Sequence, residues 1–245
     1  MNRPRVVIVV QARMGSSRLP GKVLMDLHGR PLLERQIERL RRSRAAHDII
    51  IATSTLAQDD PIIDLAAQLG IATFRGDEED VLARFAGAAA ASEADVVVRV
   101  TADCPLVDPE ILDRCVTRLL DDPDLDYVSN TLVRTYPRGL DVEVFTRDVL
   151  ERVHREASVP DDREHVTLFV WRQPERFRLG GVADHHDHSA LRWTVDTLAD
   201  LDVVRAVYDD LYPTNPSFTY SDALAHAIEH PDVHARNRHV RQKSV

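Results

Sequence analysis

Small and basic residues gather between positions 11 and 22, directly after the apolar run Val6 to Val10. The stretch contains two glycines, two serines, two arginines and one lysine. Small residues let backbone N–H groups approach an anion, and the cations Arg13, Arg18 and Lys22 supply charge, so a polyphosphate is the ligand that this composition suits. A mobile surface loop with solvated basic side chains is the alternative that composition alone leaves open.

Two common nucleotide-binding loops do not fit this stretch. A Walker A loop has four residues between its glycines and a Ser or Thr after its Lys, whereas five residues separate Gly15 from Gly21, and Val23 follows Lys22. The dinucleotide fingerprint GxGxxG is absent from the sequence. The usual kinase and dehydrogenase loops are therefore excluded.

Two aspartates follow predicted strands further along the chain. Asp103 comes after the run 96 to 100, and Asp196 comes after the run 191 to 195. Parallel sheets bind ligands at the carboxyl ends of their strands, and Mg²⁺ prefers oxygen ligands, so both carboxylates are candidate metal ligands. Each aspartate also precedes a predicted helix, where Asp is a good N-cap. The residues themselves leave both roles open.

A second pair of carboxylates, Asp141 and Glu143, alternates with valines along a strand predicted for residues 141 to 145. Both side chains then share one face, where they could bind hydroxyl groups of a ligand or help to remove a proton. A half-exposed strand with a polar outer face is the alternative. Arg99 lies inside a predicted buried strand and needs a partner there, for which we expect Asp103.

Short β-branched runs alternate with amphipathic stretches through the first half of the chain, which is typical of β-α-β units. Pro31, Pro61 and Pro109 each suit the first turn of a helix, and Gly70 suits a helix end. We predict an α/β protein with a Rossmann-like, mainly parallel sheet. The strands expected there are 6–10, 49–52 and 96–100, and the helices are 31–42, 61–69 and 109–120.

The pattern changes after about residue 130. We predict one domain over residues 1–245, with 131–190 as a small excursion from the sheet that covers the active site, forms a dimer, or both. Residues 191 to 195 are predicted to return as a strand, followed by helices over 198–212 and 221–229. The polar tail after Pro231 is expected to fray.

Composition excludes several classes of protein. The 245 residues carry a formal net charge of -9, which argues against nucleic-acid binding by phosphate neutralisation. Cys104 and Cys115 form no CxxC pair, and no apolar run approaches membrane-spanning length, so we expect a cytoplasmic protein without membrane attachment. The polar stretch holding His185, His186 and His188 lacks a fourth-ligand pattern, which favours a solvated loop over a zinc site.

The stretch Gln11 to Lys22 resembles the first motif of the spore coat polysaccharide biosynthesis SpsF-type cytidylyltransferases, relatives of the sialic acid and KDO cytidylyltransferases. Further stretches are similar to that family in the same order, and together they cover nearly the whole chain. They are Ala52 to Ser54, Arg75-Gly76, Val100 to Leu106, Tyr127 to Asn130, Gly139 to Phe145, Arg163 to Thr167 and Leu191 to Asp196.

The resemblance implies a nucleotidyltransferase fold, CTP as donor, pyrophosphate as product and Mg²⁺ on Asp103 and Asp196. It implies that Arg13, Arg18 and Lys22 act on the phosphates. The nucleotide-binding residues that it implies are Gln11, Ala12, Arg13, Gly15, Ser16, Arg18, Lys22, Thr53, Ser54, Arg75, Arg99 and Thr101, and the acceptor-binding residues are Asn130, Asp141, Glu143 and His165.

The acceptor stays open, and the candidates are a small acidic sugar or a phosphorylated or phosphonylated molecule. A metal-dependent glycosyltransferase and a non-catalytic nucleotide-binding regulator are the alternative functions. The glycosyltransferases usually carry a DxD motif, which the residues around Asp103 do not form. A homodimer is expected through residues 136–170, because their apolar side chains need to be covered; these are Val142, Val144, Phe145, Val166 and Phe169.

Overall fold

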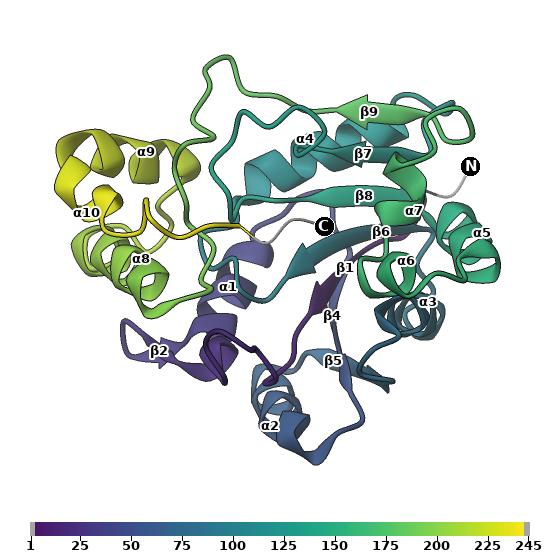
Figure 1. Ribbon diagram of the computed structural model, residues 1–245, viewed down its shortest axis with the longest axis horizontal. Coiled ribbons are helices and arrows are strands. Elements are labelled where there is room, and N and C mark those ends of the chain that lie inside the picture. The colour runs from purple at the N-terminus through teal and green to yellow at the C-terminus, as the bar shows by residue number, and fades with distance from the viewer. Residues whose placement is uncertain (1–2, 243–245) are drawn as a thin grey trace.

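The computed structural model describes residues 3–242, which form a seven-stranded sheet between two layers of helices (Figure 1). The strand order is β5-β4-β1-β6-β8-β7-β9. The strands are β1 (Val6–Gln11), β4 (Asp48–Ser54), β5 (Ala72–Gly76), β6 (Val96–Thr101), β7 (Tyr127–Ser129), β8 (Glu143–Thr146) and β9 (Leu179–Gly181), with β2 (Asp26–Leu27) and β3 (Arg30–Pro31) as a separate pair.

Helices cover both faces of this sheet because its central strands are apolar on both faces. On β1, Val6, Ile8 and Val10 pack into one core cluster, whereas Val7 and Val9 pack into the other. The first cluster includes residues of α1 (Leu32–Leu40), α2 (Asp60–Leu69), α4 (Pro109–Leu120), α8 (Leu198–Leu211) and α9 (Tyr220–Glu229). The second includes residues of α3 (Val81–Ala91), α5 (Arg147–Glu156) and α7 (Leu168–Trp171).

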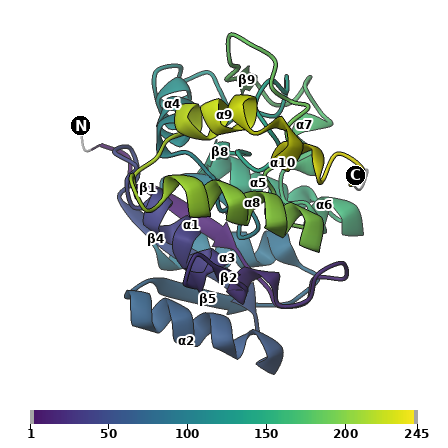
Figure 2. The same cartoon turned by 90° about the vertical axis from the view of Figure 1, so that its left-hand side faces the viewer.

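The helix boundaries follow the local signals in the sequence. Pro61 and Pro109 lie in first turns, and Gly70 ends α2 in the left-handed conformation with a φ of 65°. Pro31 instead stands at the position before α1. Helices α8 and α9 lie side by side over one side of the sheet, within a residue of their predicted bounds (Figure 2). Across residues 3–242, no helix has the length and apolar character that crossing a bilayer requires.

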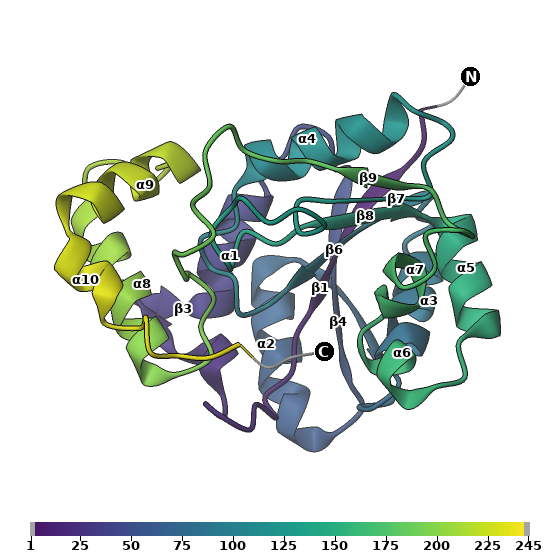
Figure 3. The same cartoon turned by 45° about the horizontal axis from the view of Figure 1, so that its top comes forward.

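The segment 131–190 is an excursion only in part. Strand β8 runs antiparallel between β6 and β7, and it pairs Glu143 with Arg99, while β9 extends the sheet beside β7. Helix α4 lies across these last strands (Figure 3). The loops and the helices α5, α6 (Pro160–Glu164) and α7 leave the sheet, but the strands of this segment belong to it.

The strand predicted over residues 191–195 is absent. This stretch makes only one isolated bridge, in which Arg192 pairs with Arg138, and Arg138 itself lies outside the strands of the sheet. The backbone N–H groups of Trp193 and Thr194 both donate to the Arg138 carbonyl oxygen, so one acceptor takes two donors and no ladder forms. Gly139 has a φ of 104°, and a Cβ there would lie 2.4 Å from the Thr194 nitrogen, so only glycine permits this close crossing.

The segment after Pro231 was expected to fray, but its described part, up to Gln242, packs against the rest of the chain, while residues 243–245 lie outside the described residues. It begins with α10 (Pro231–Ala235), which contacts α8 and α9. Val233, His234 and Asn237 are buried. The chain then runs back toward the carboxyl edge of the sheet as far as Gln242, the last residue described.

The apolar residues that suggested a dimer are covered within the single chain. Val142, Val144, Phe145 and Val166 are buried in its own core, and Phe169 packs against that core. The need to cover them therefore no longer supports self-association.

A homodimer stays a prediction, for which exposed Val159, with Val133 and Trp171 just outside the predicted segment 136–170, is the remaining support. Light scattering at micromolar concentration is expected to give about twice the mass of the 27.6 kDa chain. A mass equal to that of one chain would remove this prediction.

Candidate active site

A cavity of about 510 Å³ opens at the carboxyl ends of β1 and β6. A smaller cavity of about 150 Å³ adjoins it and shares Arg99, Arg134 and Glu143 with it. Predicted site residues that line the larger cavity are Gln11, Arg13, Ser16, Arg18, Lys22, Arg99, Thr101, Asp103, Asp141, Glu143, His165 and Asp196. The sheet edge thus brings together residues from most of the chain, as predicted.

Lys22 and the two aspartates meet at the floor of this cavity. The Lys22 ammonium donates to Asp103 Oδ2 at 2.7 Å, to Asp196 Oδ1 at 2.9 Å and to the carbonyl oxygen of Val195 at 2.7 Å. All three donors of the ammonium are therefore used. The Lys22 side chain is 9% exposed. Gly21, with a φ of 71°, makes the turn that points Lys22 inward.

The charges in this cluster hold one another in the ionised form. Burial on its own would lower the pKa of Lys22, but the Asp103 and Asp196 carboxylates outweigh burial and raise that pKa above its ordinary value. Burial would likewise raise the pKa of Asp103, but the Lys22 ammonium reverses this and lowers it. The Val195 N–H donates to the Asp103 carbonyl oxygen at 2.8 Å, which fixes the two aspartate segments against each other.

Neither aspartate caps a helix. Asp108 caps α4, where its side chain accepts from the N–H groups of Glu110 and Ile111. Thr197 caps α8 and forms a capping box with Asp200. The capping role that the sequence leaves open for Asp103 and Asp196 therefore belongs to nearby residues.

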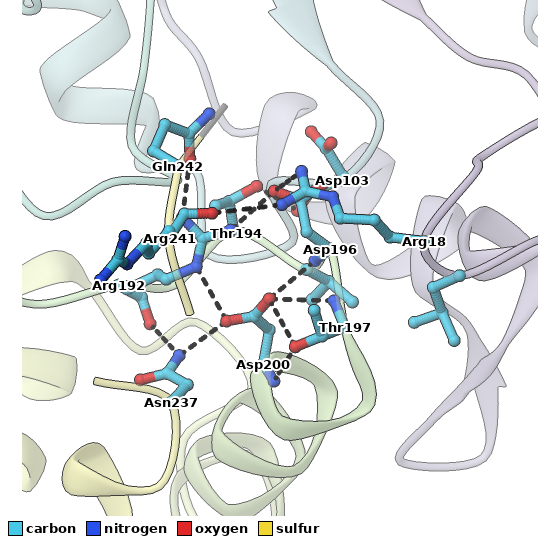
Figure 4. Close-up of polar contacts among 12 residues, drawn as sticks. Arg18, Asp103, Arg192, Thr194, Asp196, Thr197, Asp200, Asn237, Arg241 and Gln242 are labelled. Carbon is cyan, nitrogen blue, oxygen red and sulfur yellow. Dashed lines mark hydrogen bonds and ion pairs between the residues drawn. The ribbon is translucent and has the colours of Figure 1, made fainter. Parts of the chain in front are cut away.

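Two arginines hold the second oxygen of Asp196. Arg18 and Arg192 each place a guanidinium nitrogen on Oδ2, at 2.7 and 2.6 Å (Figure 4). Lys22 contacts Oδ1 at 2.9 Å. Arg192 also contacts Asp200 at 2.9 Å. Asp196 is thus surrounded by three cations, and two of these, Arg18 and Lys22, line the cavity.

The opposite wall of the cavity is organised around Arg99. Its guanidinium pairs with Glu143 and donates to Gln11 Oε1 at 3.1 Å, so its partner is not Asp103 as expected. Glu143 faces Arg99 because the two are paired across β6 and β8. Glu143 also accepts from the Tyr127 and Thr167 hydroxyls, which occupies its oxygens.

Several predicted contact residues lie behind the cavity wall. Ser54 donates to the buried Asp59 carboxylate, which also accepts the Met14 N–H at 2.7 Å. Asp59 thereby holds the basic loop, residues 11–22, in place. Arg75 donates to the carbonyl oxygens of Ser54 and Leu56. Asn130 is 1% exposed, and its amide bonds the backbone at Leu140 and Val142. Predicted residues that do not line the cavity are Ala12, Gly15, Thr53, Ser54, Arg75 and Asn130.

Sequence reasoning missed a group of cavity residues that come from irregular segments. Arg134 forms a two-bonded ion pair with Asp141, at 2.7 and 2.8 Å, and Arg138 lies nearby. Both arginines lie between β7 and β8, where no periodic pattern guides a prediction. Gln242 reaches the cavity from the C-terminal segment, which composition alone suggested would fray.

Apart from His165, no histidine in residues 3–242 lines the cavity. His185 and His186 are exposed, in keeping with the solvated loop expected for them. A different group, Asp210, His226 and His230, lies on α8 and at the end of α9, and none of these three lines the cavity.

The cavity can therefore hold a multiply charged anion beside a divalent cation. Its two carboxylates converge on one cation, and Arg18 lies beside Asp196. Arg13, which lies 4.0 Å from Glu78, also lines the cavity.

Comparison with known proteins shows the family of this chain. The sequence model of the family described as Cytidylyltransferase matches residues 7–217. The chain is 33% identical over 236 residues to the spore coat polysaccharide biosynthesis protein SpsF of Bacillus subtilis, covering 93% of this chain and 96% of that protein.

Solved structures show the same fold. A cytidylyltransferase from Leptospira borgpetersenii is similar with a TM-score of 0.91 and 30% identity, covering 99% of this chain and 100% of that one. CMP:2-keto-3-deoxy-manno-octonic acid synthetase complexed with CTP is similar in fold, with a TM-score of 0.63 at 23% identity over 84% of this chain and 98% of that one. The chain therefore belongs to the cytidylyltransferase family and is a nucleotidyltransferase with the α/β fold of that family.

Proposed function

We propose that this enzyme transfers CMP from CTP to a small anionic acceptor, an acidic sugar or a phosphorylated or phosphonylated molecule, and releases pyrophosphate. The observation that carries the proposal is the Lys22 ammonium between Asp103 and Asp196, with Arg18 beside it, in a chain of this family. The relatives support the donor, since the similar synthetase was solved with CTP.

The residues at this point fit a magnesium ion. The Asp103 and Asp196 carboxylates already flank a cation at 2.7 and 2.9 Å, so they form a preformed oxygen pair for a hard divalent ion. These two aspartates would hold Mg²⁺, and the bound ion would supply charge neutralisation on the transferred phosphate and the departing pyrophosphate.

The cations of the basic loop act on the triphosphate. Lys22 and Arg18 contact the carboxylates of Asp103 and Asp196, and we propose that both turn toward the phosphates when CTP binds, joined by Arg13. The acceptor oxygen then attacks the α-phosphorus in line as pyrophosphate leaves, so the protein needs only to position both reactants and to stabilise charge.

The acceptor side of the cavity supports an anionic substrate. Arg138 lines the cavity, and within residues 3–242 its guanidinium has no ion-pair or hydrogen-bond partner. Burial and the neighbouring Arg134 lower the pKa of Arg138, which a bound anion would reverse. Asp141 is better placed than Glu143 to bind an acceptor hydroxyl, because Glu143 already accepts from three side chains.

The first prediction concerns the donor. At matched Mg²⁺, CTP is expected to raise the melting temperature more than UTP, GTP or ATP does. A ligand present at 100 times its Kd adds about 2.7 kcal/mol to the free energy of unfolding. Differential scanning fluorimetry measures this shift, and a larger shift with another nucleotide would contradict the cytidylyl donor.

Release of pyrophosphate, detected with a candidate acceptor, separates this enzyme from the two alternative functions. A glycosyltransferase releases a nucleoside diphosphate, and a regulator turns over no substrate.

The second prediction concerns Asp103. Replacing it with asparagine keeps its size but removes a charge beside the α-phosphate, so Asp103→Asn is expected to lower turnover by about 10²-fold. Asp108→Asn is the control, because Asp108 lies five residues further along the chain and does not line the cavity. Its Oδ1 caps α4 and its Oδ2 accepts the Tyr220 N–H at 2.7 Å, so this variant is expected to lower stability while keeping turnover near the wild-type rate. Pyrophosphate release at saturating CTP compares the two, and equal rates would show that the Asp103 charge is not needed.

The third prediction concerns Lys22 and needs no substrate. Lys22→Met leaves the Asp103 and Asp196 carboxylates without the cation between them, which is expected to cost about 3 kcal/mol of stability. Mg²⁺ can occupy the vacated position, so added Mg²⁺ is expected to raise the melting temperature of this variant more than that of the wild type. The double variant Lys22→Met/Asp103→Asn is expected to lose that response. An equal Mg²⁺ shift in all three proteins would mean that these carboxylates do not form the metal site.

A further inference from the structure

Arg192 connects the active site to the C-terminal part of the chain. Its guanidinium donates through Nη2 to Asp196 at 2.6 Å, through Nε to Asp200 at 2.9 Å and through Nη1 to Gln242 Oε1 at 2.7 Å (Figure 4). The residue is 7% exposed. A planar guanidinium held at three nitrogens has its orientation fixed, and so has the carboxylate that it contacts.

Asp200 fixes the same aspartate a second time, through the main chain. Its carboxylate is fully buried. Oδ2 accepts the backbone N–H groups of Asp196 and Thr197 at 3.0 and 2.9 Å, and Oδ1 accepts from Arg192 and from Asn237 Nδ2, the latter at 3.0 Å. One buried carboxylate thus sets both the backbone position of Asp196 and the guanidinium that holds its side chain.

These contacts lie on the protected side of Asp196. Lys22 and Arg18 line the cavity, where an incoming nucleotide competes for them, whereas Arg192 and Asp200 do not line it. When the cavity cations turn to phosphate, the contacts that keep Asp196 in place are therefore those from Arg192 and Asp200.

We propose that Arg192 and Asp200 are positioning residues for Asp196, and that the segment Asn237 to Gln242 completes the active site by holding both of them. The proposal rests on the proposed function. Asn237 binds Asp200 and the Arg192 carbonyl oxygen, and Gln242 binds the Arg192 guanidinium. The Arg18 guanidinium also lies 3.5 Å from the Arg241 carbonyl oxygen.

A purely structural role for Asp200 is the competing explanation, because it is also the third residue of the α8 capping box. The chain contains a matched control. Asp222 occupies the same position in the Thr219 capping box of α9, with the same side-chain and backbone contacts to its cap. No residue of that box lines the cavity.

The main experiment compares Asp200→Asn with Asp222→Asn. An amide at position 200 must turn its NH₂ group either toward the donors Arg192 and Asn237 or toward two backbone N–H groups, so one side of the network breaks. Mn²⁺ binding in the presence of CTP, followed by electron paramagnetic resonance, is expected to weaken about 10-fold in Asp200→Asn, and kcat for pyrophosphate release to fall about 10- to 100-fold. Asp222→Asn is expected to match the wild type in both.

General loss of stability is controlled on the same helix. Val203→Ala removes buried methyl groups of α8 and leaves the polar network intact, so it is expected to lower the melting temperature without changing Mn²⁺ affinity. If Asp200→Asn does not fold, Arg192→Lys carries the test, because it keeps the charge and the capping box but loses the three-way contact.

Gln242 tests the C-terminal segment on its own. Gln242→Leu removes the acceptor for Arg192 and is expected to lower kcat about 10-fold with little change in melting temperature, since the side chain is exposed. Gln242→Glu keeps an acceptor there and is expected to retain most of the rate.

Wild-type Mn²⁺ affinity and kcat in Asp200→Asn, or in Arg192→Lys, would overturn the positioning role of Arg192 and Asp200. An unchanged kcat in Gln242→Leu would overturn the role of the C-terminal segment. A wild-type enzyme that neither binds CTP with Mn²⁺ nor releases pyrophosphate would instead overturn the proposed function, and this proposal with it.

Discussion

The Lys22 ammonium is the contact on which the arrangement of the active site depends. It is nearly buried, and a buried charge is costly unless partners surround it. Its partners come from two distant segments, the loop after β6 and the stretch before α8, which also share a backbone hydrogen bond between Asp103 and Val195. Two carboxylates this close would repel each other without a cation. The chain therefore supplies from its own Lys22 the cation that keeps the two carboxylates together.

Much of the first half of the fold could be predicted because buried parallel strands appear as continuous apolar runs, and because proline and glycine mark the helix ends, although β5 and α3 were missed. Of the later strands, β8 was predicted over residues 141 to 145 and spans Glu143–Thr146, whereas β7 and β9 were not predicted. Strands β7 and β9 span three residues each, too few for a period to show. Residues 191–195 have a strand-like sequence, but Gly139 brings the neighbouring backbone so close that the Arg138 carbonyl oxygen satisfies two of their N–H groups. For residues 191–195, tertiary contacts therefore outweighed the local preference for a strand.

The residues of the candidate site could likewise be predicted only in part. The sequence pointed to Lys22, Asp103 and Asp196, but it left their roles open, because a capping aspartate and a ligand aspartate look alike in sequence. Only the positions of Asp108 and Thr197, which take the caps, separate the two. Ser54 belongs to a family-like stretch, yet it supports the basic loop through Asp59 rather than facing the cavity. Arg134 and Arg138 were missed because the segment that carries them has no period.

The ion cluster also ties together residues that lie far apart along the chain. Lys22 and Asp196 are separated by 174 positions, and Arg18 and Arg241 by 223. Contacts of such long range form late, because the chain must first close a very large loop. During synthesis, the basic loop emerges long before its partners, and Asp103 can offer only one of the two carboxylates. A nascent chain can therefore fold much of its sheet before α8 and the segment that follows α10 have docked, and the ion cluster around Lys22 and Asp196 is complete only afterwards.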